Sequence, residues 1–218
     1  IRAYRDQSGR IENAQQSDEN LDTALHLACM AYDPPIDIIE YLVLACPEAA
    51  SMVDLKTWVP LHYACSNNSS KDVLQAVIRA YPGGKTHQDR MGRTPLHFKL
   101  AELQTKNISL DNVASNANFT DIIRILSDTG AAKLSDENGW LPLHYACAFG
   151  TSAEVVQVLL EAHPSGILEK GKNGQTALHM VMGCANKCMN VEVLECLLYF
   201  LSEMDENKRI MIMRPIDN

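Results

Sequence analysis

Apolar residues recur along the chain in short stretches that predict two alternating kinds of helix. The first kind is short and contains a Leu-His pair, which occurs at His26, His62, His97, His144 and His179. The second kind follows a polar loop and has apolar residues at helical spacing. We expect these second helices at Ile36–Ala45, Asp72–Ala80, Thr120–Ser127, Ser152–Ala162 and Val191–Leu201.

The first helices carry a repeated motif. Leu141–Cys147 reads Leu-Pro-Leu-His-Tyr-Ala-Cys, and Val59–Cys65 is almost identical. Looser copies begin at Thr23, Thr94 and Thr176, and the five histidines are spaced 36, 35, 47 and 35 residues apart. Five copies at a near-constant period indicate a repeat protein. Stacked repeats share one elongated core and function by presenting a surface.

This period and motif resemble the ankyrin repeat, whose unit opens with Thr-Pro-Leu-His-x-Ala. In that family a β-turn finger loop, often Asp-x-x-Gly, precedes the motif. Asp89…Gly92 and Asp136…Gly139 fit this pattern, Asp18 and Asp54 keep only the acid, and Gly174 keeps the glycine with Gly171 in the acid position. The resemblance covers about nine-tenths of the chain and implies an all-α solenoid of helix-turn-helix repeats with finger loops.

The repeats predict a division of the chain. The expected segments are the tail of a truncated repeat and its finger at 1–19, repeats at 20–53, 54–88, 89–135, 136–170 and 171–203, and a cap or further segment at 204–218. The first segment rests on Ile1–Tyr4, which is identical to Ile78–Tyr81, although the match could be chance. The third repeat has a polar insert at 105–119, which is either a mobile loop or a partner contact.

Charge and cysteine content narrow the class of partner and the compartment. The formal net charge is −8 and there is no basic run, which argues against nucleic acid or an anionic membrane surface. No apolar run approaches the roughly 18 residues that span a bilayer. The seven cysteines show no disulfide-framework spacing, so we expect a reducing intracellular compartment, the cytoplasm first, with an organelle left open.

The motif also raises the possibility of chemistry. His-x-x-Cys occurs at His26/Cys29, His62/Cys65 and His144/Cys147, and Zn²⁺ accepts both ligand types. Repeat packing already accounts for these residues, and histidines in adjacent repeats would lie roughly 10 Å apart, too far for shared acid–base catalysis. Pro82–Lys85 lacks the spacing of a phosphate loop. We therefore expect no enzyme activity, cofactor or metal within these residues.

The resemblance implies a partner site in the groove formed by fingers and first helices. By position, residues just before the motif are Asp22, Trp58, Arg93, Trp140 and Gln175, and residues at the exposed end of the first helix are Met30, Asn67, Glu102, Phe149 and Cys184. From these we predict partner contacts by Trp58, Arg93, Trp140, Phe149, Asn67 and Gln175.

The two tryptophans have an alternative interpretation. Val59 and Leu141 replace the capping threonine in the repeats that carry Trp58 and Trp140. Losing such a cap costs about 1 kcal/mol, so each tryptophan could instead pack on the neighbouring finger and shield the cap site.

These observations favour a non-catalytic protein–protein interaction module, acting as a scaffold, an adaptor or a structural subunit of a larger complex. The alternative is an accessory recognition domain of an enzyme whose catalytic domain lies outside residues 1–218.

Overall fold

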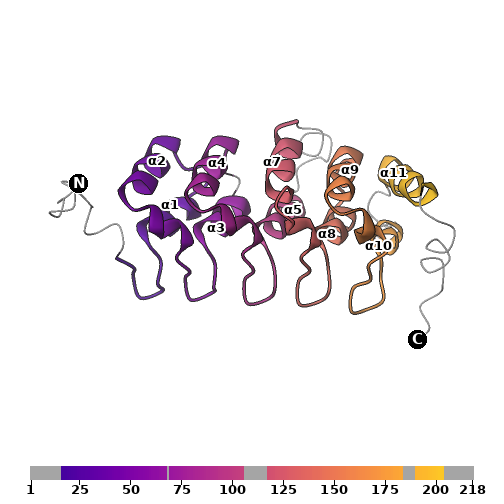
Figure 1. Ribbon diagram of the computed structural model, residues 1–218, viewed down its shortest axis with the longest axis horizontal. Coiled ribbons are helices and arrows are strands. Elements are labelled where there is room, and N and C mark those ends of the chain that lie inside the picture. Colours follow the sequence, from indigo (N-terminus) through magenta and orange to yellow (C-terminus); the bar gives the residue numbers. More distant parts are fainter. Residues whose placement is uncertain (1–15, 68, 106–116, 184–189, 204–218) are drawn as a thin grey trace. The chain divides into compact units, whose positions relative to one another are not determined.

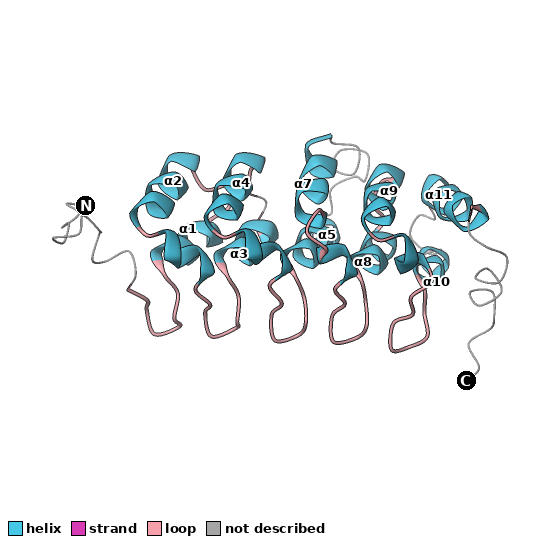
Figure 2. Cartoon of the chain, viewed as in Figure 1, coloured by secondary structure: helices cyan, strands magenta, loops and turns pink. Residues whose placement is uncertain are grey.

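The computed structural model describes residues 16–67, 69–105, 117–183 and 190–203. Across these ranges the regular structure is helical, with one isolated bridge between Ser17 and Thr23 and no β-strand (Figures 1 and 2). The chain divides into two compact units, residues 1–99 and 100–218, and the boundary falls within helix α5. Each unit is described by itself.

The first unit contains two complete helix pairs and the start of a third. Its elements are α1 (Ala24–Met30), α2 (Ile36–Ala45), the 3-10 turn η1 (Pro47–Ser51), α3 (Pro60–Ser66), α4 (Lys71–Ala80), η2 (Pro82–Thr86) and the first part of α5 (Pro95–Thr105). Within each repeat the first helix packs on the second, α1 on α2 and α3 on α4. Between repeats, first helices pack on first helices and second on second, which forms two helical layers (Figure 1).

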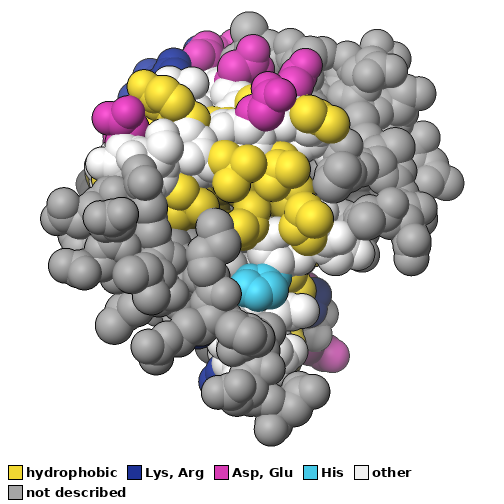
Figure 3. All heavy atoms as spheres, turned by 90° about the vertical axis from the view of Figure 1, so that its right-hand side faces the viewer, with side chains coloured by type: hydrophobic (Ala, Val, Ile, Leu, Met, Phe, Trp, Pro, Cys, Tyr) yellow, Lys and Arg dark blue, Asp and Glu magenta, His cyan; other side chains and the backbone are white. Residues whose placement is uncertain are grey.

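The second unit repeats this arrangement. Its elements are α7 (Ala117–Ser127), η3 (Ala131–Lys133), α8 (Pro142–Phe149), α9 (Ala153–Ala162), η4 (Pro164–Ile167), α10 (Ala177–Gly183) and α11 (Val191–Ser202). α8 packs on α10, and α9 lies between α7 and α11. At the end of the unit that carries α11, hydrophobic side chains gather on the surface (Figure 3).

The finger loops that contain an aspartate share one hydrogen-bonding scheme. The side-chain Oδ1 of each finger aspartate accepts the backbone N–H groups two and four residues further on, at Asp18, Asp54, Asp89 and Asp136. Gly92, Gly139 and Gly174 each have φ of +73° in the turn. Leu21 and Thr57 occupy the same position with φ of +63° and +64°, so the fingers without glycine keep the same backbone.

The second helices lie close to their predicted positions, and the largest difference is in the third repeat. There α7 begins at Ala117 instead of Thr120, because Phe119 continues the buried face formed by Ile122, Ile123 and Leu126. α5 extends to Thr105. The predicted insert at 105–119 therefore overlaps both helices, and its residues 106–116 lie outside the described residues. The same holds for Ile1–Tyr4, Cys184 and the segment 204–218.

The prediction for Glu102 was wrong. It was expected at the exposed end of a first helix, yet it is buried in α5, as is Lys99. The reason is that α5 has eleven residues, whereas α1 and α3 have seven, so Glu102 lies inside the helix and not at its end. None of the helices in the described ranges is long and apolar enough to cross a bilayer.

Candidate functional site

The motif histidines connect successive repeats. Nδ1 of His62 accepts the backbone N–H of Val59 at 3.2 Å, and Nε2 lies 3.3 Å from the carbonyl oxygen of Arg93 in the next finger. A backbone N–H can only donate, so Nδ1 is the acceptor and Nε2 carries the proton that the carbonyl accepts. His26 makes the equivalent pair of bonds, to Thr23 and Trp58. His144 also bonds to Leu141 and to the following finger, but its acceptor there is the carbonyl of Glu169, at the start of the finger.

This arrangement keeps His26, His62 and His144 neutral. Burial lowers the pKa of His62 to about 4 and also lowers the pKa of His26 and of His144. Burial also raises the pKa of the Cys29 thiol to about 12, so the thiol stays protonated. Metal binding needs a thiolate and a free imidazole nitrogen, and the pair His26/Cys29 presents neither. Among the described residues no group of three or more metal-ligand side chains comes together.

The finger side of the first unit carries a cluster of aromatic rings and cations. The Trp58 ring packs on Phe98 with centroids 4.4 Å apart and on Tyr63 at 4.8 Å. Lys56 Nζ lies 5.3 Å from the centroid of the Trp58 ring, and the Arg93 guanidinium lies 4.4 Å from that of Phe98. Both distances fall within the range of cation–π attraction. We call these five residues the aromatic–cation cluster.

Two members of the cluster, Tyr63 and Arg93, each bind the finger aspartate of their own repeat. In the second repeat the hydroxyl of Tyr63 donates to Oδ2 of Asp54 at 2.6 Å. The third repeat has Phe98 in place of tyrosine, and Arg93 instead donates to Oδ2 of Asp89 from Nε at 3.1 Å and from a terminal nitrogen at 2.8 Å. The side chain of Arg93 remains 28% exposed. Asp89 thus holds the partly exposed guanidinium of Arg93 in one orientation.

The second unit has an aromatic row of its own. Tyr145 lies between Trp140 and Phe149, with ring centroids 5.8 and 5.5 Å away. Trp140 also covers Gly171 in the next finger: a Cβ on Gly171 would lie 2.8 Å from Cδ1 of Trp140. For Trp140 this contact supports the interpretation that the indole packs on the neighbouring finger. It also explains why glycine stands where other fingers have aspartate.

The remaining predicted residues lie in different surroundings. Nδ2 of Asn67 lies within hydrogen-bond distance of the carbonyl oxygens of Cys29 and Met30, at 3.4 and 3.0 Å, which ties α3 to the end of α1. Gln175 is half-buried and accepts the N–H of Gly171 through its backbone carbonyl. Sequence reasoning missed Lys56. The available signal was a cation two residues before Trp58 in the same finger.

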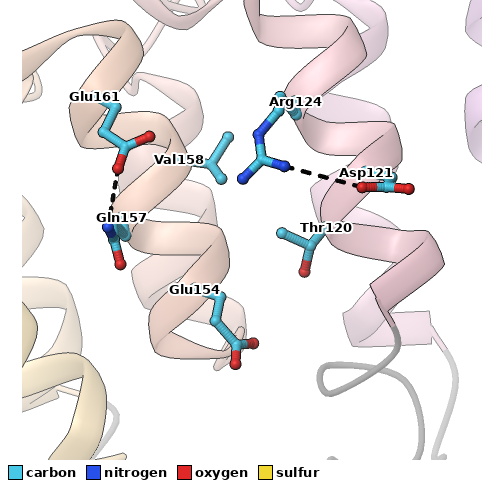
Figure 4. A pocket seen from close by; sticks show the side chains of 7 residues that line it. All are labelled: Thr120, Asp121, Arg124, Glu154, Gln157, Val158 and Glu161. Carbon is cyan, nitrogen blue, oxygen red and sulfur yellow. Dashed lines mark hydrogen bonds and ion pairs between the residues drawn. The ribbon is translucent and has the colours of Figure 1, made fainter.

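A shallow groove between α7 and α9 is the other surface feature we considered (Figure 4). It is lined by Thr120, Asp121, Arg124, Glu154, Gln157, Val158 and Glu161. Arg124 and Asp121 form an exposed pair at 3.9 Å, and Gln157 donates to Glu161 at 2.8 Å. Exposed contacts of this kind contribute little energy, and the polar groups bond within their own helices. We therefore place the candidate site on the finger side.

Helix pairs in two layers, finger loops and histidines that bond from one repeat to the next define an all-α repeat solenoid. The family model described as ankyrin repeats (3 copies) matches residues 25–102 and 102–167. The chain belongs to the ankyrin-repeat family, which confirms the resemblance drawn from the motif.

Two curated relatives are similar to part of this chain. The probable 26S proteasome regulatory subunit p28 of Saccharomyces cerevisiae is 32% identical over 127 residues, covering 57% of this chain and 49% of the relative. The tyrosine-protein kinase HTK16 of Hydra vulgaris is 29% identical over 162 residues, covering 72% of this chain and 19% of the kinase. The chain therefore spans about half the length of the first relative and about a fifth of the second.

Proposed function

We propose that this chain is a non-catalytic module that binds a partner protein through the face formed by its fingers and first helices. The observation that carries the proposal is the aromatic–cation cluster of the first unit. It presents Trp58 and Arg93, residue types that dominate binding energy at protein interfaces, on the finger side of the first unit.

The cluster is already organised for binding. Arg93 is held by Asp89 and by the Phe98 ring, so contact with a partner would immobilise little additional side-chain freedom. Its guanidinium has five N–H donors, of which the Asp89 contacts occupy two. The expected counterpart is an apolar side chain over Trp58 beside a carboxylate or backbone carbonyl that accepts from Arg93.

The proposal extends to the second unit in a weaker form. Trp140 and Phe149 offer aromatic surface on either side of Tyr145, with Gln175 in the next finger. Asn67 already bonds to the end of α1, so its substitution would disturb repeat packing together with any partner contact. Trp58 and Arg93 are therefore the sharper probes.

Compartment and partner class follow from the same proposal. None of the described cysteines, Cys29, Cys46, Cys65, Cys147 and Cys196, forms a disulfide, which supports a reducing intracellular compartment. Similarity to a proteasome regulatory subunit favours a subunit of a larger complex over a free adaptor. The net charge of −8 supports a protein as the partner, in preference to nucleic acid. We propose no cofactor.

The second candidate is an accessory recognition domain of an enzyme, and the matching region of the Hydra kinase is the observation that favours it. The two candidates differ in what surrounds the repeats in the complete gene product. A kinase catalytic sequence in the same reading frame would support the second candidate, and flanking repeats alone would contradict it.

Site-specific photocrosslinking in native extract tests the main proposal. A photoreactive phenylalanine replaces Trp58, and the control carries it at Tyr41, an exposed aromatic residue on the second-helix layer of the same unit. We expect one protein to be captured from position 58 and not from position 41. Capture of that protein from position 41 alone, or equal capture from both, would contradict the assigned face.

A charge variant adds a quantitative test on the captured partner. Arg93→Gln is expected to weaken binding at least about tenfold, whereas Arg79→Gln, an exposed arginine on α4, should leave it unchanged. Circular dichroism shows whether both variants remain folded. Equal affinities for the two folded variants would remove Arg93 from the interface.

A further inference from the structure

The outer side of α10 and α11 has the composition of a repeat interface. Met182, Val191, Leu198 and Tyr199 are exposed to 51, 54, 44 and 64%, whereas Val193 and Leu197 on the opposite side of α11 are buried. Figure 3 shows hydrophobic side chains gathered on this surface. Exposed apolar residues that cluster in this way mark a surface that another element covers. We call it the α10–α11 end face.

The hydrogen bonds of His179 are a second, independent indication that another element covers the end face. Its Nδ1 makes the usual contacts with Thr176, 3.3 Å from the backbone nitrogen and 2.7 Å from the hydroxyl. In His26 and His62 the other nitrogen, Nε2, donates to the last carbonyl of the following finger. No described residue accepts a hydrogen bond from Nε2 of His179. The end face thus presents the same donor to which a following finger binds elsewhere in the chain.

The repeat spacing identifies a segment that fits. The residue capping the second helix precedes the next motif histidine by 27 positions in three repeats: Pro35 to His62, Ser70 to His97 and Ser152 to His179. Counting 27 from Asn190, the cap of α11, gives Asp217. Arg214-Pro215-Ile216 then falls on the Thr-Pro-Leu positions, with Pro215 aligned to Pro95 and Ile216 to Leu96.

We propose that residues 209–216 form the finger and motif start of a further ankyrin repeat, docked on the α10–α11 end face. In this register Met213 aligns with Arg93, whose carbonyl accepts from Nε2 of His62, so the carbonyl of Met213 is the expected acceptor for Nε2 of His179. Ile210 aligns with Leu55 and Lys172, whose N–H groups donate to the carbonyls of Asn20 and Asn138 in the preceding finger. Ile216 aligns with Leu96, which is buried in its own repeat, and is therefore the residue expected to cover the apolar surface.

Two departures from the family pattern, at Arg209 and Ile212, have precedents within this chain, whereas Asp217 in the histidine position has none. Arg209 stands in the acid position, but the finger at Gly171 also lacks the acid and closes through backbone bonds from Gly171 to Gln175 and from Gly174 to Gly171. Ile212 stands in the glycine position, where Leu21 and Thr57 already adopt positive φ. Residues 204–218 lie outside the described residues, so the assignment rests on the spacing and on the end face.

Two isoleucines in the segment give a matched pair of variants. Ile216→Asp puts a carboxylate in the position of a buried leucine, whereas Ile210→Asp alters a position equivalent to the exposed Arg90. We expect Ile216→Asp to speed amide hydrogen exchange across α10 and α11 by about tenfold or more and Ile210→Asp to leave it unchanged. Equal exchange in the two variants would overturn the register.

The imidazole proton of His179 tests the hydrogen bond directly. By ¹⁵N NMR of the 218-residue chain, Nε2–H of His179 should exchange slowly, as for His26 and His62, and become fast in Ile216→Asp. Fast exchange in the unmodified chain would overturn the proposal. So would a dimer in sedimentation that Ile216→Asp leaves intact, because a second copy would then cover the end face. Ile212→Gly should slow exchange in α10 and α11, since the register aligns Ile212 with Leu21 and Thr57, where φ is positive, and glycine is favoured at such φ; Ile212→Ala should not.

Discussion

Nε2 of His62 donates to the carbonyl oxygen of Arg93 at 3.3 Å and so connects the first helix of the second repeat to the finger of the third. The same carbonyl accepts the backbone N–H of Asp89, which closes the finger. One backbone oxygen therefore couples the internal geometry of a finger to the preceding repeat. This relationship makes the protonation state of the histidine a determinant of stability.

Acid should destabilise the protein because His62 is neutral when folded. Its pKa is about 4 in the folded state and about 6.5 in the unfolded chain, so between these values the unfolded state binds more protons. The contribution of neutral His62 to the free energy of unfolding is fully present above pH 6.5 and is lost as the pH falls toward 4. We expect a loss of about 3 kcal/mol from His62 by pH 4, measured by urea unfolding at pH 7, 5.5 and 4.

His62→Gln is the control for this prediction. Glutamine does not titrate, so the variant should be less stable at pH 7 but should lose less of its remaining stability on acidification. Carboxylates titrate in both proteins and cancel in the comparison. If both proteins lose the same free energy of unfolding between pH 7 and pH 4, His62 does not control the acid response.

The contact between Trp140 and Gly171 predicts that a single methyl group is poorly tolerated. A Cβ at position 171 would lie 2.8 Å from Cδ1 and 3.0 Å from Nε1 of the indole, closer than carbon and nitrogen atoms can approach. Gly171→Ala should cost about 1–3 kcal/mol and displace the ring. In a Trp58→Phe background, a red shift of the fluorescence of Trp140 reports the displacement.

Gly183→Ala is the matched substitution, because a Cβ there meets no atom of the described residues within 4 Å. It should be neutral or slightly stabilising, since alanine favours helix over glycine. Similar thermal midpoints for the two alanine variants would show that the Trp140–Gly171 contact is looser than the structure indicates.

Much of the fold could be predicted because the repeats constrain one another. The second helices Ile36–Ala45 and Val191–Ser202 begin where the apolar spacing placed them, since the same pattern recurs at a fixed distance from a histidine. The predicted start of α7 was wrong by three residues. Ala117 is small and Asn118 is polar, so the apolar pattern gave no sign of them, and only the burial of Phe119 continues the helical face.

The contacts of the side chains at the candidate site could not be predicted as well from the sequence. Trp58 and Trp140 precede the same motif and were predicted as equivalent. In the structure Trp58 packs on Phe98, whereas Trp140 covers Gly171. The difference arises from the following repeat, which offers a ring in one case and a glycine in the other. Position within one repeat does not carry that information. That both residues contact a partner stays a prediction.

Tyr63 should stabilise its repeat through its hydroxyl group. The hydroxyl donates to Oδ2 of the buried Asp54 at 2.6 Å, and burial together with this bond raises the pKa of Tyr63, so the proton remains in place. Tyr63→Phe should cost about 1.5–3 kcal/mol, the range for hydrogen bonds to charged groups. In Tyr145→Phe the loss should be smaller, because that hydroxyl lies 3.0 Å from Asp136 and the ring is half-buried. Guanidinium unfolding of both variants ranks the two bonds, and a larger loss at Tyr145 would contradict this interpretation.

Thr57 is held at φ of +64°, a conformation that a β-branched residue adopts only at a cost in free energy. Thr57→Gly should relieve this strain and raise the free energy of unfolding by up to about 1 kcal/mol, after the greater entropy of glycine in the unfolded chain is subtracted. Thr57→Ala keeps a Cβ and should show a much smaller gain. Leu21→Gly is expected to behave like Thr57→Gly, because Leu21 occupies the same turn position at φ of +63°. If alanine stabilises position 57 as much as glycine does, the gain comes from losing the threonine side chain and the backbone at this turn is not strained.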